Sequence, residues 1–420
     1  RQGQVDGVEH DRRRRCGELD VDLDPTVERR GVEIRSQDDV VTDRTNVTRK
    51  AVRIEVVGSG RVVDRRVGGG DRHGAESIGI VLGQVAFDDV SNDASERPVR
   101  FDVVGVGNAL VDVIAQADER FLTSYELVKG SMTLVETDRA VELYAALDGA
   151  VEMSGGSAAN TMCGVASFGG RAAYIGKVNG DDLGDVFGHD MRAVGVEFRG
   201  GGADHGTPTG RCVIVVTPDA ERTMNTYLGV SSFLEIADVD DDVVAESQVL
   251  YMEGYLFDRD DAKAAFRHSA EVAHAHGRTV SLTLSDSFCV DRHRDDFRSL
   301  VSDEVDLLFG NEEELLSLYE MESFDDAVAA LRDECRLAAI TRGADGCVVI
   351  THDEVLRVPA VSVERVLDTT GAGDLFAAGF LYGITADRPL DECGRLGSIA
   401  AAEVISHVGP RPLVELHTLA

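Results

Sequence analysis

After residue 100, the sequence alternates regularly between short runs of apolar or β-branched residues and longer amphipathic stretches. The runs at 101–107, 172–176 and 337–341 are typical of buried strands, and the stretch at 324–334 has the spacing of an amphipathic helix. Repeated strand–helix–strand alternation predicts a mostly parallel sheet with helices on both of its faces. We therefore predict an α/β fold built as a three-layer sandwich, in which ligands bind at the carboxyl ends of the strands.

One pair of strands departs from this alternation. The β-branched run 212–216 is closed by Thr217-Pro218-Asp219, which is a turn signal, so residues 211–228 are expected to form a hairpin. We expect this hairpin to belong to a small β-lid over the binding site, to which about 109–133 and 205–232 contribute.

The first hundred residues differ from the remainder in charge and in pattern. They contain 18 basic and 20 acidic residues, which leaves 24 basic and 56 acidic residues of the total of 42 and 76 for the rest of the chain. Segments 52–57 and 78–85 have the composition of strands, without an evident partner. Because the first methionine is Met132, we expect residues 1–98 to be an extension, either disordered or upstream sequence read in frame before a start near Val99. Residues 99–420 form the expected folded domain.

Composition excludes several classes of protein. A net charge of -34 argues against a protein that wraps nucleic acid or coats an anionic membrane, because both surfaces are themselves negative. No apolar run approaches the roughly 18 residues of a membrane helix. The seven cysteines are scattered without a C-x-x-C pair, a pattern that fits reduced thiols in the cytoplasm. We therefore predict a cytoplasmic protein that acts on a small molecule and binds neither nucleic acid nor membranes.

The strongest chemical signal is Asp368-Thr369-Thr370-Gly371-Ala372-Gly373-Asp374, which runs directly into an apolar helix pattern. Glycines allow close approach of an anion to the backbone, and a helix start presents free N–H groups and the positive end of the helix dipole. A carboxylate beside such a phosphate cradle is placed to accept a proton from an attacking hydroxyl. The alternative interpretation is a glycine-rich helix start without a ligand.

Two further motifs follow predicted strands in the first half of the domain. The segment Gly155-Gly156-Ser157-Ala158-Ala159-Asn160 combines a glycine turn, which lets a polyhydroxy substrate lie against the backbone, with an amide one helical turn later. The segment Gly107-Asn108-Ala109-Leu110-Val111-Asp112 places an amide and a carboxylate after the first strand. A tight strand-to-helix turn and ordinary loop residues are the respective alternatives.

Two other motifs follow strands in the second half. Acidic oxygens in Asn311-Glu312-Glu313-Glu314 can hold Mg²⁺ through its waters beside phosphates, although an acidic first turn of a helix is also ordinary. Thr341-Arg342-Gly343-Ala344-Asp345-Gly346 can offer a hydroxyl and close backbone to a nucleotide, or form a plain β-turn. The chain contains no lysine-bearing Walker loop, which argues against a P-loop ATPase.

The order and spacing of these five motifs resemble those of the ribokinase-like (PfkB) carbohydrate and nucleoside kinases across residues 101–410. The stretch 155–184 looks like the first signature of that family, and 368–374 looks like its second signature. Within the family, 107–112 and 222–229 are most similar to the bacterial adenosine kinases. The resemblance implies a ribokinase-like fold and transfer of the γ-phosphoryl group of ATP to a primary hydroxyl. Adenosine, converted to AMP in purine salvage, is the acceptor that these matches favour.

The resemblance also implies a role for each matching residue. The residues implied to act in catalysis are Asp374 as general base, the amides of Gly371, Ala372 and Gly373 as an anion hole, and Arg222 as a neutraliser of the transferring phosphate. The residues implied to hold the acceptor are Asn108, Asp112, Gly155, Gly156 and Asn160. Those implied to bind ATP and its ions are Asn311, Thr341, Gly343 and Gly346, with Glu314 for Mg²⁺ through water, and Asp368 and Thr370 for K⁺.

Three alternatives remain at this point. A sugar kinase of the same fold would act on ribose, fructose or a related sugar, and would not need an apolar pocket beyond the ribose site. A catalytically idle, ligand-sensing relative is disfavoured because the glycine turn and Asp374 are intact. A Rossmann dehydrogenase is disfavoured because Gly105-Val106-Gly107 lacks the third glycine of G-x-G-x-x-G. Both a monomer and a homodimer are compatible with the sequence.

Overall fold

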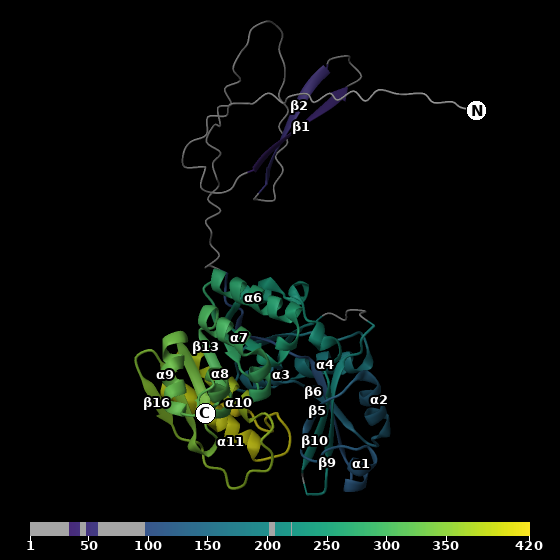
Figure 1. The fold of residues 1–420 in the computed structure, drawn as a ribbon, viewed down its shortest axis with the longest axis vertical. Coiled ribbons are helices and arrows are strands. Elements are labelled where there is room, and N and C mark those ends of the chain that lie inside the picture. The colour runs from purple at the N-terminus through teal and green to yellow at the C-terminus, as the bar shows by residue number, and fades with distance from the viewer. Residues whose placement is uncertain (1–32, 43–47, 58–96, 201–205, 220) are drawn as a thin grey trace, which may run out of the picture. The chain divides into compact units, whose positions relative to one another are not determined.

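The computed structural model describes residues 33–42, 48–57, 97–200, 206–219 and 221–420. The chain divides into two units, Arg1–Val85 and Ala86–Ala420, and each is described by itself (Figure 1). In the first unit, strands β1 (Glu33–Thr42) and β2 (Thr48–Val57) form an antiparallel pair in which Glu33 lies opposite Val57. The predicted strand 52–57 lies within β2, and β1 is its partner. The predicted strand 78–85 lies outside the described residues.

In the described part of the second unit, nine strands form one large sheet. Every neighbouring pair from β14 to β8 is parallel, and β15 and β16 add an antiparallel edge. This confirms the predicted, mostly parallel sheet. In spatial order the strands are β16 (Val355–Val358), β15 (Cys347–Thr351), β14 (Leu337–Thr341), β13 (Leu307–Asn311), β12 (Thr279–Thr283), β11 (Ser247–Glu253), β3 (Phe101–Val106), β7 (Ala172–Ile175) and β8 (Glu197–Arg199).

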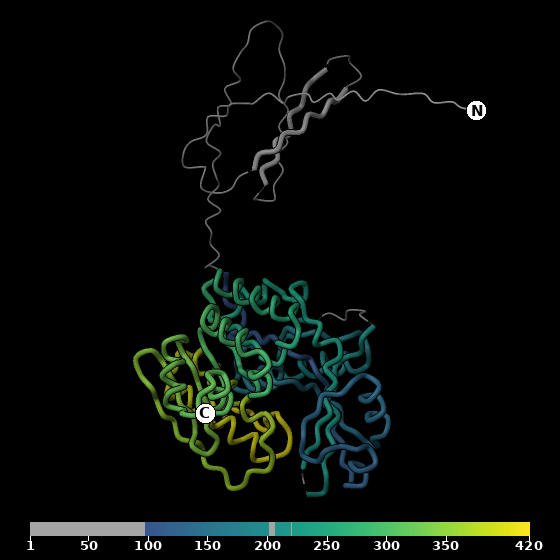
Figure 2. Tube along the Cα trace, in the orientation of Figure 1, coloured from purple at the N-terminus to yellow at the C-terminus, as the bar shows by residue number. Residues whose placement is uncertain are grey.

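Helices cover both faces of the large sheet, because successive side chains of each buried strand point to opposite sides. Val104 and Leu308 pack into one apolar core, and their neighbours Val103 and Leu307 pack into the other. The helices of the first core are α5 (Asp241–Ala245), α6 (Asp260–Ala275), α7 (Ser287–Asp303), α8 (Glu312–Tyr319) and α9 (Phe324–Glu334). Those of the second core are α3 (Ser157–Ser167), α4 (Asp182–Ala193), α10 (Ala372–Thr385) and α11 (Leu390–Ile405). The predicted three layers are therefore present, and the chain can be followed through them by colour in Figure 2.

A second sheet of five strands, which we call the small sheet, lies beside the large one (Figure 1). Its β9 and β10 form the predicted hairpin, and helix α2 (Thr137–Ala146) packs against these two strands. Strands β4, β5 and β6 of this sheet were not among the predicted strands. In spatial order the strands are β5 (Met132–Leu134), β10 (Arg222–Tyr227), β9 (Gly210–Val216), β4 (Leu110–Gln116) and β6 (Val151–Gly155).

Shorter helical segments connect these elements. One is the α-helix α1 (Glu119–Ser124), capped by the side chain of Asp118. The others are the 3₁₀ turns Gly229–Phe233, Ile236–Asp238, Gly254–Asp258, Gly343–Asp345 and Leu416–Thr418. Across the described ranges, none of the helices combines the length and the apolar character that crossing a membrane requires.

Candidate active site

One cavity of about 790 Å³ is lined by the small sheet and by residues that follow strands of the large sheet. Because these strands are parallel, their carboxyl ends meet at one edge, where α/β folds commonly bind ligands. The polar residues at or just beyond those ends are Asn108, Glu253, Thr283, Asn311 and Thr341. The small sheet contributes Asp112, Met132, Cys212, Met224 and other residues from the opposite side.

The predicted glycine-rich segment 368–374, called the glycine turn below, leads into helix α10, and its residues 369–374 line this cavity. Gly371 is the N-cap with φ 80°, and a Cβ atom there would lie 2.7 Å from the carbonyl oxygen of Pro410, so glycine is required. Of the predicted anion-hole amides, that of Ala372 donates to the carbonyl of Thr369 at 3.2 Å. The first turn of a helix leaves its N–H groups without intrahelical partners, and those of Gly373 and its neighbours therefore border the cavity at a positive helix end.

Asp374 lies in the first turn of α10 and is held by two side chains of helix α3. Its Oδ1 accepts a hydrogen bond from Ser157 Oγ at 2.6 Å, and its Oδ2 accepts one from Asn160 Nδ2 at 3.0 Å. Burial raises the pKa of Asp374 above its ordinary value, opposed by these two hydrogen bonds and by the charge of Arg411. The carboxylate is thus fixed in orientation and made more basic. Sequence reasoning did not single out Ser157, although it adjoins the predicted glycine pair.

Asp112 shares the cavity with Asp374 and depends on the glycine pair. A Cβ atom on Gly155 would lie 2.5 Å from the carboxyl group of Asp112, and one on Gly156 would lie 2.3 Å from the carbonyl oxygen of Asn108. Gly156 also has φ 98°, so these glycines let strand β6 turn into α3 directly against the acid. Burial raises the pKa of Asp112 to about 6, opposed by Arg411 and Arg222 and reinforced by Asp374. The segment 155–160 is therefore both a tight strand-to-helix turn and a part of the candidate site.

Glu253, at the end of β11, is a buried site residue that sequence reasoning missed. Its Oε1 accepts hydrogen bonds from both the backbone N–H and the side-chain amide of Asn108, at 3.2 and 3.0 Å. Its Oε2 accepts one from the N–H of Ala158, at 2.8 Å, in the first turn of α3. Burial raises its pKa to about 7, opposed by these hydrogen bonds. The feature of the sequence that could have identified Glu253 is that a charged residue ends an otherwise apolar strand.

Replacement of Glu253 by Gln should lower the free energy of unfolding by about 1–3 kcal/mol, because an amide turns one of its two acceptors into a donor that faces a backbone N–H. Chemical denaturation checks this, with Glu142→Gln, at an exposed position, as a control expected to stay within about 0.5 kcal/mol of the wild type. Equal stability of the two variants would show that the hydrogen bonds of Glu253 to Asn108, just after β3, and to Ala158, in α3, do not stabilise the fold.

Arg222 and Asp368 form a buried ion pair between the small sheet and the glycine turn, with both side chains 7% exposed. Asp368 also accepts hydrogen bonds from the backbone N–H groups of Thr370, at 3.0 Å, and Gly409, at 2.9 Å. Burial would raise the pKa of Asp368, but these hydrogen bonds and Arg222 together hold it below its ordinary value. Because Arg222 and two amides engage this carboxylate, its oxygens do not fit direct coordination of K⁺, which the resemblance implied for Asp368 and Thr370.

The residues expected at the nucleotide end divide into two groups. Asn311 and Thr341 lie opposite each other on β13 and β14 and line the cavity, whereas Gly343 and Gly346 do not line it. Asn311 and Glu314 form a capping box: Oδ1 of Asn311 accepts the N–H of Glu314 at 2.9 Å, and Oε2 of Glu314 accepts the N–H of Asn311 at 3.0 Å. Their oxygens fit contact with Mg²⁺ through its waters rather than direct coordination.

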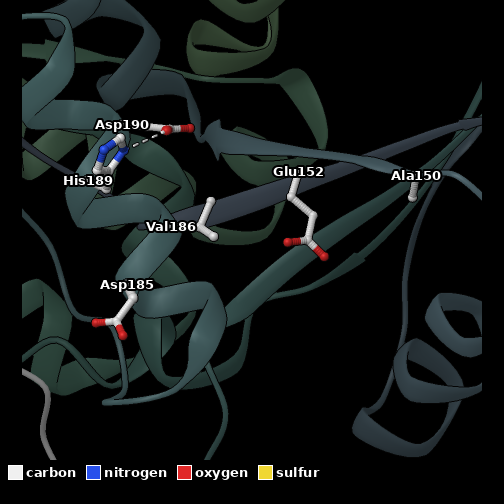
Figure 3. Close-up of a pocket in the computed structure, with 6 residues that line it drawn as sticks. All are labelled: Ala150, Glu152, Asp185, Val186, His189 and Asp190. Carbon is white, nitrogen blue, oxygen red and sulfur yellow. Dashed lines mark ion pairs between the residues drawn. The ribbon is translucent and has the colours of Figure 1, made fainter.

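A second depression, more open to solvent, lies between β6 and α4 and shares no residue with the cavity above. Figure 3 shows the carboxylates of Glu152, Asp185 and Asp190 around it, with the ring of His189 beside Asp190. Among the residues that the structure describes, no group of three or more histidine, cysteine or acidic side chains is arranged to hold a metal ion. This depression therefore offers neither a metal site nor the donors that a phosphate would require.

Known proteins are similar to this chain in sequence and in fold. The chain is 52% identical to an adenosine kinase of known structure from Sinorhizobium meliloti, with a TM-score of 0.70 over 76% of this chain and 98% of that one. It is 48% identical to a probable sugar kinase of known structure from Rhizobium etli, with the same TM-score and coverage. Adenosine kinase 2 of Arabidopsis thaliana is 25% identical over 73% of this chain and 94% of that protein.

The model of the family described as pfkB family carbohydrate kinase matches residues 128–416. This range contains the glycine pair, the capping box and the glycine turn before α10. The predicted ribokinase-like fold and kinase class are thereby confirmed. The chain belongs to the pfkB family of carbohydrate kinases and is a kinase.

Proposed function

We propose that this kinase transfers the γ-phosphoryl group of ATP to the primary hydroxyl of adenosine, forming AMP. The observation that carries the proposal is the placement of Asp374, which Ser157 and Asn160 orient at the amino end of α10, in the same cavity as Asp112. This arrangement brings a base, a positive helix end and groups for sugar hydroxyls to one place. Phosphoryl transfer needs this positioning and charge neutralisation more than covalent participation.

In the proposed reaction, Asp112, Asn108 and Asn160 bind the ribose hydroxyls and direct the primary hydroxyl toward Asp374. The carboxylate of Asp374 accepts the hydroxyl proton as the oxygen attacks the γ-phosphorus. The backbone amides of Gly371 and Gly373 stabilise the charge on the transferring group, whereas that of Ala372 is engaged by the carbonyl of Thr369. One such donor is worth on the order of 3 kcal/mol in related oxyanion sites. Arg222 does not line the cavity in this structure, but its guanidinium nitrogens Nε and Nη2 are buried without a hydrogen-bond partner among the described residues. We propose that these nitrogens become donors to the phosphate when the small sheet closes.

ATP and Mg²⁺ are the cofactors expected for a kinase of this family. Asn311, Glu314 and Thr341 are the residues that would hold the metal-bound phosphates at the nucleotide end of the cavity, with Glu314 acting through water. Mg²⁺, when bound, supplies neutralisation of phosphate charge. We propose no requirement for K⁺, because Arg222 already neutralises Asp368.

A nucleoside is favoured over a free sugar by the apolar wall of the cavity. Met132 and Leu134 of the small sheet line the cavity with 48% and 52% of their surfaces exposed, and Phe288 of helix α7 lines it with 75% exposed. Burial of apolar surface stabilises by roughly 25 cal/mol per Å², so a purine base against these side chains would add affinity that a sugar lacks. We propose that the small sheet acts as a lid that closes over the base and excludes water.

The acceptor is tested by an ATP-consumption screen with adenosine, inosine, guanosine, ribose and fructose. We expect turnover with adenosine at a kcat/KM at least 10-fold above that of either sugar, since one well-filled apolar contact is worth about 1–3 kcal/mol. The variant Met132→Asn should raise KM for adenosine without a comparable change for any sugar that is used. Turnover with ribose or fructose alone would replace the proposed nucleoside kinase by a sugar kinase of the same fold.

A further inference from the structure

A short segment near the carboxyl end of the chain, residues 409–411, contacts three parts of the active site. The N–H of Gly409 donates to Asp368 at 2.9 Å, and Pro410 packs against Gly371, where a Cβ atom would meet its carbonyl oxygen at 2.7 Å. Arg411 Nε donates to the side-chain oxygen Oδ1 of Asn160 at 3.2 Å. Three successive residues thus contact both ends of the glycine turn and the helix that faces it.

Arg411 is connected to Asp374 through a single side chain. Asn160 accepts from Arg411 with Oδ1 and donates with Nδ2 to Oδ2 of Asp374, at 3.2 and 3.0 Å respectively. We propose that Arg411 is a positioning residue, which fixes the amide of Asn160 and, through it, the carboxylate of Asp374. The proposal rests on the proposed function for its catalytic consequence, but the hydrogen-bonded chain itself does not depend on the acceptor.

The chain of hydrogen bonds permits only one orientation of the Asn160 amide. In the reversed orientation, its NH₂ group would face the guanidinium of Arg411, and its carbonyl oxygen would face the carboxylate of Asp374. The first contact would then join two donors and the second two acceptors, so neither hydrogen bond could form, whereas the observed orientation makes two charge-assisted hydrogen bonds. Without Arg411, the amide loses the partner that selects its orientation, and Asp374 keeps only Ser157 as a fixed donor.

The charge of Arg411 also acts on a group of buried acids. It lowers the pKa of both Asp374 and Asp112, each of which burial raises. The other ionisable groups close enough to Asp374 to feel its charge are Asp112 on β4, Tyr251 and Glu253 on β11, and Tyr255 just after it. Loss of the guanidinium should therefore raise the pKa of Asp374 further and keep the base protonated to higher pH.

The first test follows the titration of Asp374 in the protein without substrate. Potentiometric titration of the wild type minus that of Asp374→Asn isolates this carboxyl group, and the same difference is measured in an Arg411→Gln background. We expect the midpoint to be about one pH unit higher in that background, and close to wild type with Arg411→Lys, which keeps the charge. An unchanged midpoint with Arg411→Gln would overturn the proposal, whatever the acceptor proves to be.

The second test is a double-mutant cycle with Asn160→Ala, on whichever acceptor the wild type phosphorylates. Arg411→Gln alone should lower kcat roughly 10- to 100-fold, the range for a misplaced catalytic group, and move the acid limb of kcat/KM upward in pH. At a pH well above the acid limb, where the charge of Arg411 does not decide the protonation of Asp374, the same substitution in the Asn160→Ala background should change kcat by less than about 3-fold, because the hydrogen-bonded route to Asp374 is gone. Equal losses in both backgrounds would overturn positioning through Asn160.

A matched control is Arg388→Gln, which removes a surface arginine that is 52% exposed. It should leave kcat, the pH profile and the Asp374 titration unchanged. Thermal unfolding of each variant identifies any that fails to fold. If the wild type phosphorylates no acceptor, the proposed function fails, while the Asp374 titration still decides whether Arg411 acts on this carboxylate.

Discussion

Replacement of Asp374 by Asn should lower kcat at least ~100-fold, the low end for loss of a general base. The amide has nearly the same size but cannot accept the hydroxyl proton, so KM for both substrates should change little. Steady-state kinetics check this, with Asp353→Asn, at a position whose side chain is 97% exposed, as a control that should retain full activity. A near-normal kcat in the Asp374 variant would remove this residue from the mechanism.

The pH dependence provides a second readout of the same residue. Because burial raises the pKa of Asp374, the rate of the wild type should decline with falling pH from a point above the usual range of an aspartate. The residual activity of Asp374→Asn should lack this limb, since its side chain does not titrate. An identical acid limb in both proteins would assign it to another group, of which Asp112 is the nearest candidate.

Replacement of Arg222 by Gln should lower kcat by roughly 10³-fold, the lower end of the effect of an arginine that neutralises a transferring phosphate. The same change leaves Asp368 as a buried charge without its partner, which costs about 3–5 kcal/mol of stability. The double variant Arg222→Gln with Asp368→Asn removes both charges, and should recover stability without recovering kcat. Denaturation and single-turnover kinetics separate the two effects.

The double variant also decides between two roles for Arg222. If it is a phosphate ligand, the loss of kcat persists once the buried charge has been removed. If kcat instead returns to within about 10-fold of the wild type, Arg222 serves the fold through its ion pair, and the phosphate must be neutralised by other groups.

The parts of the fold that follow from local pattern were predictable from the sequence. Helix α9 has the residues 324–334 that its amphipathic spacing predicts, and the parallel strands β3, β7 and β11 to β14 match their apolar runs. Strand β6 was missed although its residues alternate, because what fixes it as a strand is its pairing with β4, a long-range contact that its short sequence does not show. The same applies to the pairing of β4 and β5 with the predicted β9–β10 hairpin, because these segments are distant in sequence.

The candidate site likewise contains residues that the local sequence identifies and residues that only long-range contacts bring in. Glycine turns are recognisable because they need particular backbone angles, so Gly156 and Gly371 could be identified from spacing alone. Ser157, Glu253 and Arg411 act through contacts 95 to 251 residues apart, and no local pattern encodes such contacts. For Asn311 and Glu314 the sequence alone could not decide between two roles, because a helix capping box and a phosphate-binding pair use the same residues.

The most direct test of the proposed reaction is to follow adenosine and MgATP by ³¹P NMR, with 5′-deoxyadenosine in a parallel sample. We expect the γ-phosphate signal of ATP to be replaced by the phosphomonoester signal of AMP with adenosine, and no transfer to the analogue, which lacks the primary hydroxyl. Release of inorganic phosphate at equal rates with both compounds, or formation of a phosphoester on another hydroxyl, would contradict an Asp374-activated attack by the primary hydroxyl.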